Sequence, residues 1–188
     1  MGKLRKFVSG KYTSLSLLVA VVVASGVLLF VFRPFQVAGN SMQPTFAHGE
    51  FVLVETFTHR FDKLTTGRFG LNRGDVLVFE NPHDTEHVTI KRVIGLPNEE
   101  VDVSREGVRI TDRETGEEEF FANGTLIGGM VSGEEFEMKL GPEDYFVLGD
   151  NRAESNDSRQ FGAVQKVNMI GTVIGRIWPL SQSADDII

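Results

Sequence analysis

The stretch HVTIKRVI at residues 87–94 is the clearest guide to the fold, because β-branched residues surround a central basic pair. Valine, isoleucine and threonine fit a pleated, half-buried surface, so this stretch predicts a strand. Similar runs occur at FVLVETF (51–57), DVLVFE (75–80), YFVLGD (145–150) and MIGTVIGRIW (169–178), separated by glycine, proline and asparagine. The runs lie too close together for βαβ crossovers. The sequence therefore predicts a mostly β body.

Residues 101–143, between two of these runs, have a different composition. They contain many acidic residues, short alternating runs, and turn pairs such as Asn-Gly at 123–124 and Gly-Gly at 128–129. This pattern predicts a smaller, hairpin-rich β insertion. The β core is then expected to consist of residues 33–100 and 144–188.

An uncharged apolar run, LSLLVAVVVASGVLLFVF, occupies residues 15–32. As a helix rising about 1.5 Å per residue it would be about 27 Å long, close to the thickness of the hydrocarbon core. Four basic residues precede it within 1–14 and only Arg33 follows directly, which predicts a cytoplasmic N-terminus and a transmembrane anchor. The alternative is a signal peptide cleaved near 37–39, but signal h-regions usually span only about 7–15 residues.

The overall composition suits one globular domain, or one domain with a small appendage. The 188 residues are 41% hydrophobic and 24% charged, and none is cysteine. The lack of cysteine excludes disulfides, thiol nucleophiles and cysteine-ligated metals. Residues 34–188 hold 14 of the 19 basic residues and all 26 acidic ones, and so acidic a body is a poor candidate for binding nucleic acid.

The loop GNSMQPT at 39–45 contains a candidate nucleophile. Gly39 permits unusual backbone angles, and Pro44 removes a donor and fixes the chain locally. Such a loop can present the Ser41 hydroxyl beside a free backbone N–H, which acyl transfer needs to stabilise an oxyanion. Taken alone, a serine between glycine and proline is more often an ordinary turn.

A base for this serine is offered by Lys91, in the predicted strand at 87–94. Burial among apolar neighbours lowers the pKa of a lysine, and a lysine base works best at a pKa of about 7–8. On spacing alone, a surface strand with Lys91 and Arg92 in solvent is the commoner alternative. The polar loop GDNRAESNDSR at 149–159 could supply a second hydroxyl, Ser155, to hold the amine, or could be a solvated turn.

Together these segments resemble bacterial type I signal peptidases, which are serine proteases with a Ser-Lys dyad. The family has a Ser-Met-x-Pro-Thr box after its membrane anchor, matched by SMQPT at 41–45, and an Arg-Gly-Asp strand opening, matched by RGDVLVF at 73–79. KRVIGLP at 91–97 and GDNRAESNDSR at 149–159 match its two other boxes. The order and spacing agree, and the resemblance extends to IWP at 177–179.

The resemblance implies a mechanism and a role for each box. Ser41 would attack the carbonyl at the cleavage site, neutral Lys91 would take its proton and later activate water, and Ser155 would orient the lysine. The backbone N–H of Ser41 would form part of the oxyanion hole, with Gly39 where some members carry a serine. No cofactor or metal is implied. Five residues would support the last loop: Asp150, Asn151, Arg152, Asp157 and Arg159.

The resemblance also implies a substrate, a fold and a location. The family removes signal peptides from exported preproteins after small residues at positions −3 and −1, and the substrate would add a strand beside residues 87–91. The fold would be an all-β catalytic domain of coiled antiparallel sheets, a partial barrel, with one transmembrane helix. Its partners would include the lipid bilayer of the plasma membrane and the export translocon, with the catalytic domain on the extracytoplasmic side. Bulky walls would keep the substrate pockets shallow, at the matching positions Phe35, Val37, Met42, Phe46, Thr89 and Ile90.

Three other interpretations remain open. HDTEH at 83–87 fits the H-x-x-E-H zinc pattern, but that pattern needs a helix and a turn into a strand is expected here. A Ser-His-Asp triad could use His87 as its base, although the signal peptidases with a histidine at the position of Lys91 are those of the endoplasmic reticulum and archaea. The third interpretation is a membrane-tethered β module that binds peptides without cutting them, although such a module would not need an intact Ser41, Lys91 and Ser155.

Overall fold

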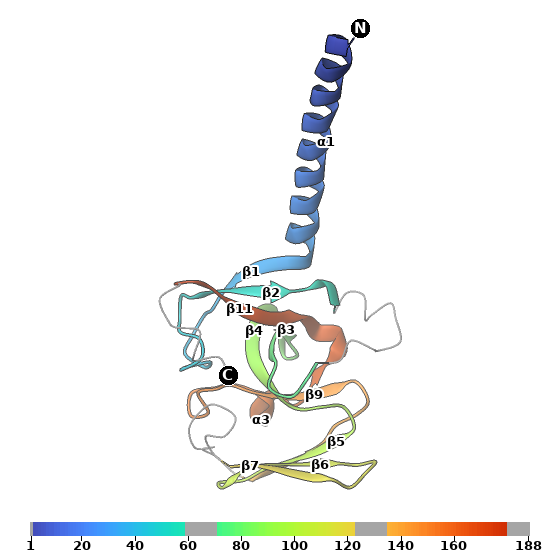
Figure 1. Cartoon of the computed structure of the whole chain (residues 1–188). Helices are drawn as coiled ribbons and strands as arrows, with labels where there is room; N and C mark the ends of the chain where they lie inside the picture. The colour runs from blue at the N-terminus through green and yellow to red at the C-terminus, as the bar shows by residue number, and fades with distance from the viewer. Residues whose placement is uncertain (1, 59–70, 123–134, 180–188) are drawn as a thin grey trace.

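A computed structural model describes residues 2–58, 71–122 and 135–179. Figure 1 shows one long helix, α1, extending away from a body of two β-sheets. Two short helical turns lie within the body, α3 (Ser158–Phe161) and η1 (Lys166–Asn168). The body is therefore built almost entirely of strands and their connections.

Helix α1 (Gly2–Val31) is formed by the apolar run and most of the basic segment before it. Its side chains are described from Leu15 onward, and the large apolar ones between there and Phe30 are all more than half exposed. The chain changes to strand at Phe32. Among the described residues, no helix is long and apolar enough to cross a membrane. The transmembrane anchor predicted at 15–32 is therefore not confirmed.

The main sheet has seven strands in the order β1-β2-β11-β3-β4-β9-β10. Every pair of neighbours in it is antiparallel. Strand β2 alternates between inward and outward residues, with Val52 and Val54 fully buried. The strands are β1 (Phe32–Gln36), β2 (Phe51–Glu55), β3 (Val76–Asn81), β4 (Asp84–Gly95), β9 (Asp144–Leu148), β10 (Val164–Gln165) and β11 (Met169–Trp178).

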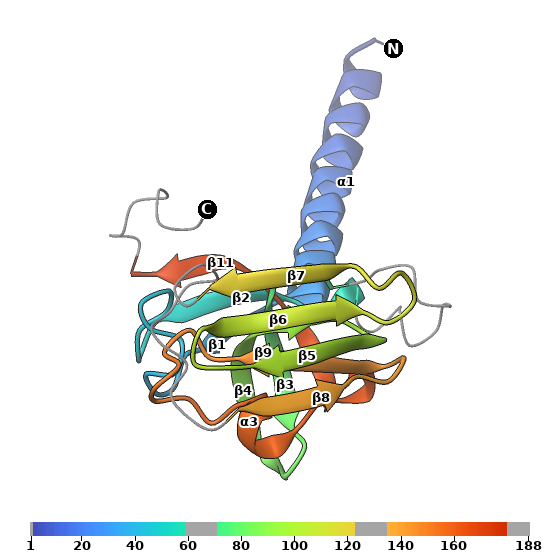
Figure 2. The same ribbon diagram turned by 90° about the horizontal axis from the view of Figure 1, so that it is seen from below.

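A second sheet of four strands, in the order β7-β6-β5-β8, lies across the body from α1 (Figure 1) and is seen face-on in Figure 2. Its pairings are also antiparallel, so the prediction of an all-β, mainly antiparallel body is confirmed. The strands are β5 (Glu99–Val103), β6 (Gly107–Asp112), β7 (Glu118–Ala122) and β8 (Phe136–Lys139).

The two sheets share an apolar core. Val101 and Val103 point inward from β5, and they pack in one cluster with Ile94, Phe146 and Leu148 of the main sheet. All five side chains are fully buried. Burying a side chain of this size stabilises the fold by roughly 1.5–3 kcal/mol relative to exposing it.

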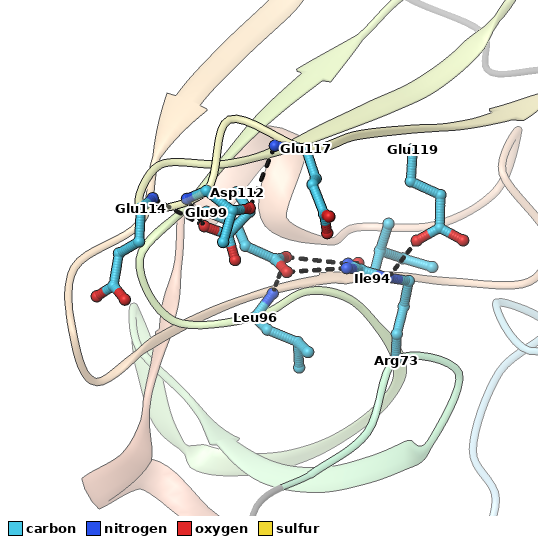
Figure 3. A network of polar contacts seen from close by, with 9 residues as sticks. Arg73, Ile94, Leu96, Glu99, Asp112, Glu114, Glu117 and Glu119 are labelled. Atoms are coloured by element: carbon cyan, nitrogen blue, oxygen red, sulfur yellow. Dashed lines mark hydrogen bonds and ion pairs between the residues drawn. The ribbon is translucent and has the colours of Figure 1, made fainter.

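Arg73, just before β3, joins the two sheets through a polar network (Figure 3). It donates to the Ile94 carbonyl and to both carboxylate oxygens of Glu99, the latter at 2.8 and 3.0 Å. Glu99 also accepts from the Leu96 N–H at 2.7 Å, and Glu119 of β7 lies 3.4 Å from Arg73 Nε. The arginine of the predicted strand opening therefore fastens the turn between β4 and β5 to the start of β3.

We expect Glu99→Ala to lower the free energy of unfolding by about 3 kcal/mol, because the mostly buried Arg73 loses its main partner and the Leu96 N–H loses its acceptor. Glu119→Ala is the matched control. Glu119 contacts the same arginine but is 59% exposed, so its loss should cost less than about 1 kcal/mol. Urea unfolding of the purified proteins measures both values, and equal losses would contradict this account.

Candidate functional site

Strand β4 carries Lys91 and leaves part of one edge open. Val88–Lys91 pair with β3, whereas pairing with β9 begins only at Arg92. Within the described part of the chain, no strand pairs with the second edge of β4 before Arg92. An edge of this kind offers backbone N–H and C=O groups to an added strand.

The Ser41 hydroxyl lies directly beside the Lys91 amine. Lys91 Nζ is 2.7 Å from Ser41 Oγ and 3.0 Å from the carbonyl oxygen of Ile90. Lys91 is 4% exposed, and this burial lowers its pKa to about 8, although Asp157 and Asp150 act in the opposite direction. Part of the lysine population is then neutral near physiological pH and can accept a proton from the hydroxyl.

Ser41 belongs to a closed loop of residues 37–50, which we call the Ser41 loop. The ends of the loop are joined by a hydrogen bond from the Val37 N–H to the Glu50 carbonyl at 2.8 Å. The Asn151 N–H donates to the Ser41 carbonyl at 2.9 Å, whereas the Ser41 N–H has no acceptor among the described residues. This N–H is available to a developing oxyanion.

Gly39, two residues before Ser41, has a φ of +88°, which side chains rarely adopt. A Cβ at this position would meet nothing within 4 Å, so the backbone angle, and not lack of space, favours glycine. The Gly39 N–H donates to Nδ1 of His48 at 3.0 Å. This contact of His48 had no signal in the sequence.

Asp150 connects the loop after β9 to β4 and to the Ser41 loop. It is fully buried, and its two oxygens accept from Arg92 Nε and Nη2 at 2.8 and 2.6 Å. It also accepts from the Thr45 hydroxyl. The basic pair in β4 is thus divided between two partners, since Lys91 contacts Ser41 and Arg92 contacts Asp150. The alternative of a solvent-facing pair is therefore wrong.

Asp157 and Arg159 stabilise the loop after β9 through contacts within that loop. Arg159 Nε and Nη2 donate to the two Asp157 oxygens at 2.8 and 2.9 Å, and Asp157 also accepts from the Gly149 N–H at 3.0 Å. Arg159 reaches the Arg152 carbonyl at 2.7 Å, and Arg152 Nε donates to the Gly149 carbonyl at 3.1 Å. Asp157, Arg152 and Arg159 thus contact one another or the loop backbone, whereas Asp150 contacts Arg92 and Thr45 outside the loop.

Ser155 is brought to the site but does not bond to the lysine. Its hydroxyl is buried and has no hydrogen-bond partner among the residues that the structure describes, so the contact with Lys91 implied by the resemblance is not formed here. A Cβ on Gly149 would come within 2.2 Å of Ser155 Oγ and 2.5 Å of the Ser41 carbonyl oxygen. Glycine is therefore required where these two segments meet.

A cleft of about 380 Å³ is bordered by Ser41 and Lys91. Two of the six expected pocket residues, Met42 and Phe46, are buried in an apolar cluster beside it. The other four line the cleft: Phe35, Val37, Thr89 and Ile90. Further lining residues could not be identified from the sequence, because they come from several strands and from the tip of a polar loop: Gln36, Val52, Val78, Asn81, Val88, Glu154 and Asn156.

The histidines at 83–87 form neither of the two alternative sites, zinc or triad. Strand β4 begins at Asp84, so the helix required by the zinc pattern is absent. His87 Nδ1 lies 2.7 Å from Asp84 Oδ2, and both side chains are more than half exposed. Across the described ranges, no group of three potential metal-binding side chains is present. The amine that contacts the Ser41 hydroxyl is that of Lys91.

Known proteins resemble this chain over most of its length. The family described as "Signal peptidase, peptidase S26" matches residues 11–178. Signal peptidase I V of Bacillus subtilis strain 168 is 34% identical over 163 residues, covering 82% of this chain and 91% of that protein. Signal peptidase IB of Staphylococcus aureus strain Mu50 is 32% identical over 182 residues, covering 89% of each. A crystal structure of a signal peptidase I from Enterococcus faecalis V583 has 25% identity and a TM-score of 0.42, covering 55% of this chain and 96% of that one.

These matches show the class of enzyme to which the chain belongs: it is a hydrolase, a peptidase of the serine type. It belongs to the signal peptidase family, peptidase S26. The resemblance to type I signal peptidases is therefore confirmed. Signal peptidase function implies preprotein substrates, and the family is membrane-associated.

The buried amine predicts how stability depends on pH. Below about pH 8, Lys91 is charged in both the folded and the unfolded chain, so folding includes the full cost of burying the charge. Between about pH 8 and the ordinary pKa of 10.5, the folded chain loses the proton first, so stability rises with pH. Relative to Lys91→Met, wild-type stability should rise by up to about 3 kcal/mol over this range. Urea unfolding at several pH values measures the difference, and parallel curves would refute it.

Proposed function

We propose that this chain removes signal peptides from exported preproteins after small residues at positions −3 and −1, with Ser41 as nucleophile and Lys91 as general base. One observation carries the proposal: Lys91 Nζ lies 2.7 Å from Ser41 Oγ, and burial lowers the pKa of this amine to about 8. A neutral amine at this distance can take the hydroxyl proton as the oxygen attacks a carbonyl.

Each step uses groups of the site in turn. Ser41 Oγ bonds to the scissile carbonyl carbon, its proton passes to Lys91 Nζ, and the Ser41 N–H stabilises the oxyanion. The Lys91 ammonium then protonates the leaving amine of the mature protein, the C–N bond breaks, and an ester remains on Ser41. Lys91, neutral again, takes a proton from a water whose oxygen attacks the ester carbon. The C–O bond to Ser41 then breaks, the Lys91 ammonium returns a proton to Ser41 Oγ, and the signal peptide leaves with a carboxylate.

The open edge of β4 supports binding of the substrate as an added strand. Residues 88–91 have no partner strand on that side within the described residues. Successive side chains of a strand point to opposite faces, so positions −1 and −3 would face the same wall of the cleft. Phe35, Val37 and Ile90 line that cleft, and Met42 packs beside it. An alanine therefore fits where a larger side chain would clash.

In the proposed mechanism, Ser155 is a positioning residue for the Lys91 amine. Its buried hydroxyl has no hydrogen-bond partner within the described part of the chain and lies near the Ser41 backbone. When Ser41 Oγ becomes part of the ester, the Lys91 amine loses one acceptor, and a rotation about χ1 of Ser155 could supply another. The contacts of Asp150 and Asp157 with Arg92 and Arg159 would keep this loop in place.

The same proposal places the protein in the plasma membrane, with the body outside and the N-terminus inside. The large apolar side chains of α1 between Leu15 and Phe30 are exposed in the isolated chain. So large an apolar surface is unfavourable in water and favourable in lipid. Three further features stay predictions. They are the single-pass topology over 15–32, the core at 33–100 and 144–188 with its insertion at 101–143, and a contact with the export translocon.

Cleavage of a preprotein whose signal ends in Ala-x-Ala tests the chemistry. In detergent, wild type should cut after the final alanine, and Ser41→Ala and Lys91→Ala should reduce the rate by about 10³-fold or more. The wild-type kcat/KM should rise with pH through a midpoint of about 8, because only the neutral Lys91 amine is a base. Initial rates and the mass of the products measure these outcomes.

Two further variants sharpen this test. Ser155→Ala should lower kcat by about tenfold without abolishing cleavage, since it removes only the contact with Lys91 that the χ1 rotation would form during the reaction. Lys139→Ala, a 60% exposed lysine of the second sheet, is the control and should match wild type. Activity that persists in Lys91→Ala would exclude Lys91 as the base. A folded wild type that cuts nothing would contradict the proposed function.

The membrane placement can be tested by adding protease to intact bacterial cells that lack an outer membrane. The body should be digested, while a fragment containing the apolar run at 15–32 stays with the membrane and survives alkaline extraction. A cytoplasmic marker protein that stays intact is the control. Protection of the body would overturn the orientation, and release of the chain by alkali would overturn the anchoring.

A further inference from the structure

Arg176 of β11 contacts the Ser41 loop at three points. Nη2 donates to the Thr45 carbonyl at 2.5 Å, and Nε lies 2.9 Å from Oε2 of Glu50. The guanidinium carbon lies 5.7 Å from the centre of the Phe46 ring, a distance at which cation and ring attract each other. The side chains of Arg176 and Glu50 are only 13% and 8% exposed.

Glu50 closes the Ser41 loop on itself. Its Oε2 accepts from the Ala47 N–H at 3.1 Å, and its carbonyl accepts from the Val37 N–H at 2.8 Å. Arg176 lies opposite Val52 in the pairing of β11 with β2, the strand that begins directly after Glu50. The register of these two strands therefore carries Arg176 to the end of the loop.

Thr45, four residues after Ser41, is held by two arginines. Its carbonyl accepts from Arg176, and its hydroxyl accepts from Arg92 at 3.3 Å while donating to Asp150. Two ion pairs from different strands thus meet at one residue of the loop. This arrangement fixes both the backbone and the side chain of Thr45.

We propose that Arg176 is a positioning residue, which keeps Ser41 Oγ beside Lys91 by pairing with Glu50 and by holding the Thr45 carbonyl. This inference rests on the proposed peptidase function. Arg176 acts through the loop, by its contacts with Glu50 and with the Thr45 carbonyl. A displacement of about 1 Å from reactive geometry lowers a rate by about 100-fold, so a small relaxation of the loop is enough to slow the reaction.

Two conservative variants test the proposal in the full chain, in detergent. Arg176→Lys keeps the charge opposite Glu50 but cannot reach both Glu50 and the Thr45 carbonyl with a planar fork. Glu50→Gln keeps the shape and removes the ion pair. Arg109→Ala is the matched control, because Arg109 forms an exposed pair with Glu118 at 3.4 Å on the second sheet.

The expected result is a fall in kcat of about tenfold or more in Arg176→Lys, with KM within about twofold of wild type. Glu50→Gln should act in the same direction, and the double variant should be slower than Arg176→Lys alone, because the lysine keeps a charge opposite Glu50 and the second change removes that remaining attraction. The pH midpoint set by Lys91 should stay at that of wild type. Arg109→Ala should match wild type throughout.

Unchanged kcat in both folded variants would overturn the proposal. A fall in kcat that is explained entirely by thermal unfolding of the variants would overturn it as well. Amide exchange gives a readout that needs no activity. The Gln43 and Phe46 amides, hydrogen-bonded within the loop, should exchange faster in Arg176→Lys while those of β3 do not. A wild type that fails to cleave would contradict the proposed function. Amide exchange alone would then test the role of Arg176, and unchanged protection of the Gln43 and Phe46 amides in Arg176→Lys would refute it.

Discussion

The site depends on a lysine amine that is held out of water beside a hydroxyl. Burial is the largest influence on the pKa of Lys91 and lowers it to about 8, although Asp157 and Asp150 oppose the shift. Both carboxylates are themselves bonded to arginines, Arg159 and Arg92. Their attraction for the ammonium is therefore partly cancelled, and burial decides the outcome. Any change that lets water reach the amine would restore an ordinary lysine, which is protonated at neutral pH and cannot act as a base.

Three buried carboxylate–arginine pairs fasten the loops of the site. Such pairs contribute little net stability, because the cost of removing two charges from water offsets much of their attraction. The hydrogen bonds of Asp150–Arg92 and Asp157–Arg159 have fixed directions, however, so they can hold a loop in one place where apolar packing alone would leave several arrangements. Glu50 and Arg176 meet as an ion pair. The three pairs are Asp150–Arg92, Asp157–Arg159 and Glu50–Arg176.

The β class could be predicted because strand patterns are local, and the β-branched run around Lys91 is one of them. The contact of Lys91 with Ser41 joins residues 50 positions apart, so it followed from the family resemblance and not from spacing. The role of Arg176 could not be predicted, because it depends on the register between two distant strands. Met42 and Phe46 were expected at the pocket walls. They lie in the cluster beside the cleft because the turn of the Ser41 loop directs them inward.

Glycine at position 149 shows how closely the two loops of the site must approach. A methyl group there would lie 2.2 Å from the Ser155 hydroxyl and 2.5 Å from the Ser41 carbonyl, so any side chain would push the loops apart. That displacement would also strain the hydrogen bond from the Asn151 N–H to the Ser41 carbonyl, at 2.9 Å. The missing side chain at Gly149 and the buried ion pairs therefore act on one quantity, the distance between Ser41 Oγ and the Lys91 amine. Glycine permits the approach, and the pairs maintain it.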